Sequence, residues 1–285
     1  MGREVDDMKK WLPVIGYTVL AVVVYYIIDV LLSMVFGLWV LSASSKEQYY
    51  RYTLFANIIQ KAVTLLVFGF WYRKKTAKSK SAKRAGKKIS VKSGICLLGI
   101  GLFGQYAMSF LLMLIYLVFP AAFARYEELT SSVSLSNSYP LLILFLVVIL
   151  GPVAEEIFFR GVIYGQLREG FSAVAAACIS GVMFGVYHKN LVQGIYAAIC
   201  GVVLACLFEK THTIWGSIIT HVMFNLGSYL VAAVRNILNH FHWRLPAVYL
   251  FAIQILCLVI VCLLIHTIRR EPQENELSRS ENELF

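Results

Sequence analysis

The chain has 285 residues, of which 59% are hydrophobic and only 15% are charged, and its mean hydropathy is +0.71. About a quarter of the residues of an average soluble domain are charged, so this composition excludes an ordinary soluble protein. The apolar residues form long runs without amphipathic spacing, which predicts an all-α fold, a polytopic membrane helix bundle.

Eight runs along the chain are candidate transmembrane helices, because about 20 apolar residues cross the hydrocarbon core of a bilayer. The fifth and sixth runs are short and are separated only by His-Lys-Asn. The first run is too long for a signal peptide and lacks a small-residue cleavage site, so we expect no cleavable signal. In chain order the runs are Trp11–Leu41, Thr53–Tyr72, Ser93–Phe119, Pro140–Arg168, Ala173–Tyr187, Leu191–Phe208, Ile214–Val234 and Ala247–Ile268.

A basic stretch, residues 73–92, separates the second and third runs. It holds ten Lys and Arg residues and no acid. Its charge of +10 therefore equals the net charge of the whole chain. A short basic loop of a membrane protein belongs on the cytoplasmic side. We expect it to face anionic lipid headgroups rather than nucleic acid.

These features divide the chain into three parts. Residues 1–10 form an N-terminal segment, residues 11–268 a transmembrane domain, and residues 269–285 a polar tail that we expect to be disordered. Alternation of the spans places both ends in the cytoplasm of an integral, multi-pass protein of the plasma membrane.

Two adjacent glutamates lie inside the fourth run, in the sequence GPVAEEIFFR. An ionised carboxylate in hydrocarbon costs several kcal/mol unless it is paired or hydrated. Glu156 and Arg160 are four residues apart on one helical face, which predicts a buried structural pair. Glu155 points elsewhere and is left as the carboxylate free for chemistry. Alternatively, all three residues form one solvated network at a helix end.

Two further runs carry polar residues at the same spacing. The sequence FGVYH places Phe184 and His188 on one face, and HVMFN places His221 and Asn225 on another. Polar groups inside a bundle need one another or water as partners. Glu155 and His188 lie level, each about 25 Å along its helix from the turn between them. His221 is shallower, about 10 Å deep, so tilt or longer helices must bring it to the other two.

These three motifs, in this order on successive spans, resemble the CAAX prenyl protease and bacteriocin-processing family, which includes the Abi proteins. The resemblance covers residues 140–235 and implies an intramembrane glutamate-dependent endopeptidase. It implies that Glu155 activates a water held by His188, and that His221 and Asn225 donate hydrogen bonds to the oxyanion. It implies neither cofactor nor metal, and the substrate would be a membrane-associated or lipidated peptide or protein. The residues expected to support the site are Glu156, Arg160 and Phe184.

Other readings of the same residues stay open. Glu155, His188 and His221 are chemically suitable zinc ligands. A non-proteolytic membrane scaffold, a bacteriocin self-immunity protein or a regulator of a membrane sensor would use the fold without cleavage. A transporter would use intramembrane Glu and His as proton relays, but the sequence shows no inverted repeat to support it.

Two charged residues lie outside the resemblance, Asp29 in the first run and Lys61 in the second. Measured from the turn between these runs, their depths differ by only about 6 Å. We therefore expect them to form an ion pair. In the alternative, Lys61 reaches the membrane interface and Asp29 faces a hydrated cavity.

Overall fold

The computed structural model of the protein describes residues 2–78, 89–134, 139–242 and 246–268. The polar tail and residues 79–88 of the basic stretch lie outside these residues. The regular elements of the described part are all helical. They are α1 (Gly2–Leu41), α2 (Lys46–Lys78), α3 (Val91–Val118), α4 (Pro120–Ser134), α5 (Pro140–Leu144), η2 (Phe145–Leu150), α6 (Gly151–Glu156), η3 (Ile157–Tyr164), α7 (Gly165–Leu167), α8 (Ala173–Tyr187), α9 (Leu191–Thr211), α10 (Ile214–His240) and α11 (Ala247–Thr267).

The predicted membrane helix bundle is confirmed. Seven helices in the described residues are long and apolar enough to cross a bilayer, the unit α5–α7 counting as one. The predicted fifth span, α8, is apolar but has only 15 residues. It rises about 22 Å, which is less than the roughly 30 Å of the hydrocarbon core. The count of eight full spans is therefore reduced to seven and one short helix.

A tight turn follows α8 after Tyr187. Lys189 adopts a left-handed backbone with φ 55°, which is uncommon for a residue with a side chain. The Asn190 side chain then accepts a hydrogen bond from the Gln193 N–H and caps the start of α9. Helices α8 and α9 thus form a short antiparallel hairpin whose tip carries His188.

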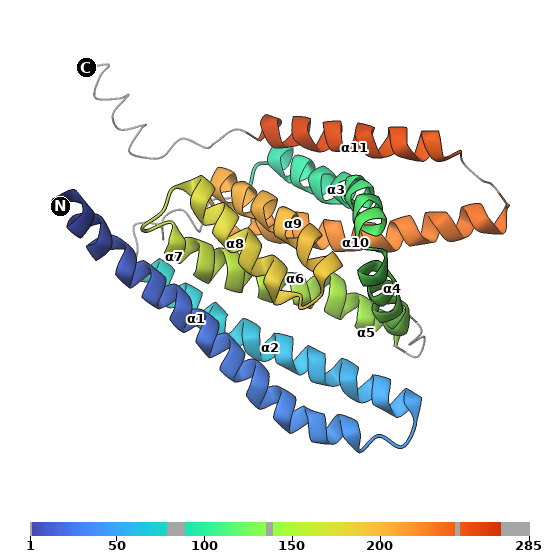
Figure 1. Cartoon of the computed structure of the whole chain (residues 1–285), viewed down its shortest axis with the longest axis horizontal. Helices are drawn as coiled ribbons and strands as arrows, with labels where there is room; N and C mark the ends of the chain where they lie inside the picture. The colour runs from blue at the N-terminus through green and yellow to red at the C-terminus, as the bar shows by residue number, and fades with distance from the viewer. Residues whose placement is uncertain (1, 79–88, 135–138, 243–245, 269–285) are drawn as a thin grey trace.

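The helices are arranged around the unit α5–α7, as Figure 1 shows. The α1–α2 hairpin lies on one side of it, and α3, α10 and α11 lie on the other. The ends of α2 and α3 that flank the basic stretch lie at one end of the bundle, whereas the α1–α2 turn and α4 lie at the opposite end. We refer to these as the basic end and the far end.

Helix α4 was not expected from the sequence. Its sequence, PAAFARYEELTSSVS, is polar and has no apolar run, although Pro120 at its first position favours a helix start. It packs against α3 and α9 at the far end. The Tyr126 hydroxyl of α4 lies 3.4 Å from the Tyr196 hydroxyl of α9.

The helix that carries the glutamates widens twice. The Gly151 N–H donates to the Leu146 carbonyl five residues back, and the Gly165 N–H likewise donates to the Arg160 carbonyl. Pro152 has no N–H and its ring would clash with a carbonyl in a regular α-helical turn, which explains the first wide turn. Such π-type turns are frequent at functional sites.

Glycines allow the closest helix contacts. A Cβ added to Gly181 of α8 would lie 2.6 Å from a methyl carbon of Val202 and 2.8 Å from the Ala198 carbonyl oxygen of α9. Gly101 of α3 faces the Thr220 backbone of α10 just as tightly. Small residues at such contacts let membrane helices approach and gain packing energy.

We predict that Gly181→Ala destabilises the protein by about 1–3 kcal/mol, because the added methyl group must push α8 and α9 apart. Thermal unfolding of the purified protein in detergent measures the change. Gly69→Ala in α2 is the matched control, since nothing lies within 4 Å of its added Cβ. A Gly181→Ala variant with the same melting temperature as the wild-type protein would contradict the packing contact.

Candidate active site

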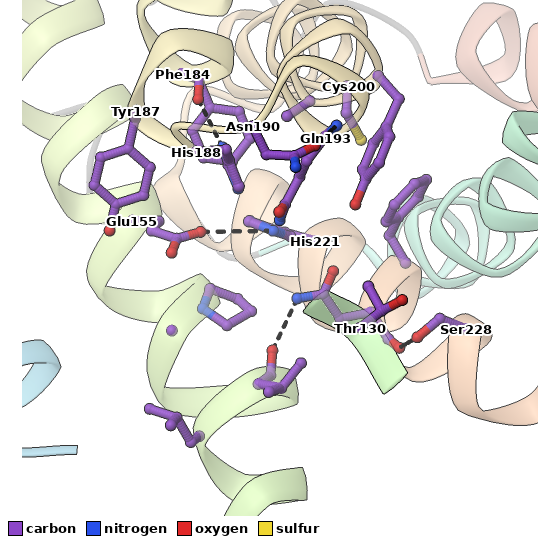
Figure 2. A pocket seen from close by; sticks show the side chains of 18 of the residues that line it. Thr130, Glu155, Phe184, Tyr187, His188, Asn190, Gln193, Cys200, His221 and Ser228 are labelled. Atoms are coloured by element: carbon purple, nitrogen blue, oxygen red, sulfur yellow. Dashed lines mark hydrogen bonds and ion pairs between the residues drawn. The ribbon is translucent and has the colours of Figure 1, made fainter. Parts of the chain in front are cut away.

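A cavity of about 790 Å³ lies beside the tip of the α8–α9 hairpin. Glu155, His188, His221 and Asn225 all line it, so the fold brings together the three polar motifs (Figure 2). Helices outside those motifs contribute further polar side chains. These are Asp29, Asn57, Gln60, Lys61, Gln105, Tyr126 and Thr130.

Glu156 lies beneath the cavity and is completely buried, as is Arg160. The predicted pair between them is present, with 3.0 Å from Arg160 Nη1 to Glu156 Oε1. The same carboxylate oxygen lies 2.8 Å from His221 Nδ1. Arg160 also donates to the Gly201 carbonyl at 3.0 Å and lies over the Phe184 ring. Glu156 therefore contacts not only Arg160 but also the histidine of α10.

Although His221 lies near the start of α10, it reaches both glutamates. Because an ionised carboxylate only accepts hydrogen bonds, Nδ1 of His221 carries the proton that is donated to Glu156. Its Nε2 then faces Glu155 Oε2 at 4.0 Å (Figure 2). This separation is too long for a direct hydrogen bond and suits a bridging water.

His188 is oriented by the last turn of α8. Its Nδ1 lies 2.8 Å from the Phe184 carbonyl oxygen. A carbonyl only accepts, so Nδ1 carries a proton and Nε2 is left as an acceptor. The Phe184 ring stands perpendicular to both imidazoles, at 4.7 Å from the His188 ring and 5.7 Å from the His221 ring. Phe184 thus packs against both histidines.

Glu155 has a basic partner, contrary to expectation. Lys61 of α2 places its Nζ 2.6 Å from Glu155 Oε1 and also donates to the Tyr187 hydroxyl. Both side chains of the ion pair are largely buried, with 13% of Glu155 and 19% of Lys61 exposed. The spacing within one helix showed correctly that Arg160 does not serve Glu155, but it could not reveal a partner on another helix.

The expected Asp29–Lys61 pair is wrong. Asp29 instead lies 3.1 Å from Lys189 Nζ and accepts a hydrogen bond from Gln60. The depths of Asp29 and Lys61 were compatible, but depth does not fix the direction in which a side chain leaves its helix. Both residues line the cavity. In the alternative considered for Asp29, this residue also faces a cavity.

Asn225 donates a hydrogen bond to a backbone carbonyl that has no helical partner at the first wide turn. Gly151 donates to Leu146 and Pro152 has no N–H, so neither of them donates to the Val147 carbonyl. The Asn225 Nδ2 donates to that carbonyl at 2.8 Å. An amide nitrogen carries two hydrogens, so the second is left for another acceptor.

The zinc reading does not fit this arrangement. Within the described ranges, no group of three His, Cys, Asp or Glu side chains is gathered closely enough to hold a metal ion. In addition, the Lys61 ammonium already binds one of the two Glu155 oxygens, Oε1.

Several cavity residues were missed from the sequence. Tyr187 is adjacent to His188 in the FGVYH motif, but a tyrosine in an apolar helix reads as packing. Asn190 and Gln193 read as turn and capping residues. Lys61 could be singled out from the sequence because it is a lone cation in an apolar run. The sequence did not indicate that Glu155 is its partner.

Comparison with known proteins covers the same part of the chain. Residues 137–227 match the family model described as "Type II CAAX prenyl endopeptidase Rce1-like". A protein of Bacillus subtilis (strain 168) named "Putative membrane peptidase YdiL" is 39% identical over 77 residues, which are 27% of this chain.

That match spans about a third of the relative's own length, 32%. No solved structure matches the chain. The matched residues nevertheless include Glu155, Glu156, Arg160, His188 and His221, all of which meet in and below the cavity. The resemblance inferred from the three motifs is thus confirmed for residues 137–227, the segment in which the chain is similar to the Rce1-like, CAAX prenyl protease family.

Proposed function

We propose that the chain is an intramembrane endopeptidase in which Glu155 activates a water to hydrolyse a peptide bond. The observation that carries this proposal is the 4.0 Å gap between Glu155 Oε2 and His221 Nε2 inside a polar cavity. A water in that gap touches a base, and the cavity beside it has room for a peptide. Lys61 holds the other carboxylate oxygen, Oε1, and so directs Oε2 toward the gap.

The reaction begins with proton transfer from the water to Glu155, while Nε2 of His188 accepts the second water hydrogen. The water oxygen forms a bond to the carbonyl carbon of the substrate. Negative charge then develops on the carbonyl oxygen, where Asn225 donates its second amide hydrogen. His221, which Glu156 holds through Nδ1, supplies the second hydrogen bond from Nε2 when that nitrogen also carries a proton.

The tetrahedral intermediate collapses when the bond between carbon and nitrogen breaks. Glu155 returns its proton to the leaving nitrogen, which becomes an amine, and the other product is a carboxylic acid. Water attacks directly, so no acyl-enzyme forms. Arg160 and Phe184 do not touch the substrate in this scheme; they hold Glu156 and the two imidazoles.

We predict that Glu155→Gln abolishes cleavage, with a loss of roughly 10²–10⁴-fold, because the amide cannot accept the proton of the water. Membrane peptides from cells with wild-type protein are compared with those from cells with the variant. A synthetic peptide that spans a bond cut only by wild-type protein is then the substrate for purified protein.

The control for this comparison is Glu169→Gln, which changes an exposed glutamate at the basic end. Near-wild-type turnover by folded Glu155→Gln would remove the proposed base. If the biological effect of the protein survives this substitution, the non-proteolytic scaffold becomes the better reading.

Arg160→Ala should cost about 3–5 kcal/mol of stability, because it leaves the Glu156 carboxylate buried without its cationic partner. Glu169→Ala is the control. It breaks a 4.0 Å ion pair with Lys75 in which the glutamate is 51% exposed, and such a pair contributes about 1 kcal/mol or less. Thermal unfolding of both variants decides the matter: a stable but inactive Arg160→Ala protein would place Arg160 in the chemistry instead.

Lys61→Met should lower kcat about 100-fold with little change in KM, since a misplaced base costs about that much. Lys61→Arg should recover part of the loss, because a guanidinium also binds a carboxylate. Lys75→Met is the matched control on the same helix, where Lys75 donates to Gln166 near the basic end. If folded Lys61→Met has the wild-type kcat, Lys61 serves only the fold.

A further inference from the structure

The residues that line the cavity are distributed unevenly along their helices. On α3 they are Gln105, Met108 and Leu112, which belong to the half of the helix farther from the basic stretch. On α10 the lining begins at His221 and continues outward as far as Ala232. The cavity therefore extends from the catalytic residues toward the far end of the bundle.

In the opposite direction the bundle is closed. From Phe158 to Tyr164 each side chain of the glutamate helix is buried, with at most 3% exposed. Phe184 of α8 and Ala205 of α9 pack in the same cluster and are equally buried. About 18 Å of helix separates Glu155 from Leu167 at the basic end. Among the residues that the structure describes, this packed layer lies between the site and the basic end.

The short α8–α9 hairpin explains the asymmetry. Because α8 ends at Tyr187, the turn at residues 188–190 lies part-way along the neighbouring helices and not at the far end of the bundle. The space beyond the turn is the cavity, and α4 lies across it with Tyr126 and Thr130 in its wall. Lys189 at the turn has a side chain that is 63% exposed. The mouth of the cavity thus lies at the far end, beside α4.

We infer that the substrate reaches Glu155 from the membrane face opposite the basic stretch, and that the bond cut belongs to a peptide segment exposed on that face. By the excess of Lys and Arg in residues 73–92, this face is the extracytoplasmic one. The wall amides of Asn57, Gln60, Asn190 and Gln193 offer both donors and acceptors to a peptide backbone. The identity of the substrate segment depends on the proposed hydrolysis, whereas the direction of the opening does not.

Cysteine accessibility tests the direction without any cleavage. Ser228→Cys places a thiol of similar size in the cavity wall. Ser45→Cys in the α1–α2 turn marks the far end, and Glu169→Cys marks the basic end. A membrane-impermeant methanethiosulfonate is applied to intact cells and to inverted membrane vesicles, and mass spectrometry locates the labelled residues, so the native cysteines can remain.

We expect Ser228→Cys to be labelled in the preparation that labels Ser45→Cys, and not in the one that labels Glu169→Cys. Labelling together with Glu169→Cys, or in neither preparation, would overturn the inference. If Ser228→Cys fails to fold, Gln193→Cys at the start of α9 takes its place in the same wall.

A second measurement concerns the substrate. Peptides lost in Glu155→Gln cells should derive from segments on the same membrane face as Ser45. Peptides that derive instead from the face of Glu169 contradict the inference but leave the proposed hydrolysis intact. Far-end labelling without any peptide that depends on Glu155 keeps the direction of the cavity and removes the hydrolysis.

Discussion

The buried carboxylate of Glu156 is the interaction on which the site depends. One oxygen of this carboxylate binds both Arg160 of its own helix and His221 of α10, and Arg160 in turn binds the Gly201 carbonyl of α9. An unpaired charge at such a depth would cost several kcal/mol, so these partners must stay together in the folded protein. The network ties three helices at one depth and aims His221 at Glu155. The absence of a side chain at Gly201 gives Arg160 this access, because an added Cβ there would lie 3.3 Å from the guanidinium nitrogen.

A second constraint comes from the backbone. In a membrane every carbonyl needs a donor from the protein or from a buried water. Pro152 makes this harder by widening the helix before the glutamates, and Asn225 supplies a donor to Val147. A residue expected to serve only the oxyanion therefore also completes the fold. The two tasks are compatible because one amide nitrogen carries two hydrogens.

The segment that matches the family does not complete the cavity by itself. Two ion pairs cross from it to the α1–α2 hairpin, Glu155 with Lys61 and Lys189 with Asp29. Each joins a charge of the matched segment to an opposite charge outside it, so the cavity walls are polar without a large net charge. The hairpin therefore contributes to the electrostatics of the site as well as to the bundle. In particular, Lys61 distinguishes the two oxygens of Glu155, holding one and leaving the other to face His221.

The sequence by itself determined the membrane bundle, because long apolar runs have no other stable solvent. It also determined which residues share a helical face, since residues four apart always do; the contact between Glu156 and Arg160 followed from this rule. The tertiary structure decided which faces meet. Lys61 binds Glu155 instead of Asp29, His221 reaches the glutamates from a shallower start, and the polar helix α4 covers the cavity. These contacts depend on helix rotation, tilt and the shortness of α8, and none of these is encoded in the spacing of residues along one helix.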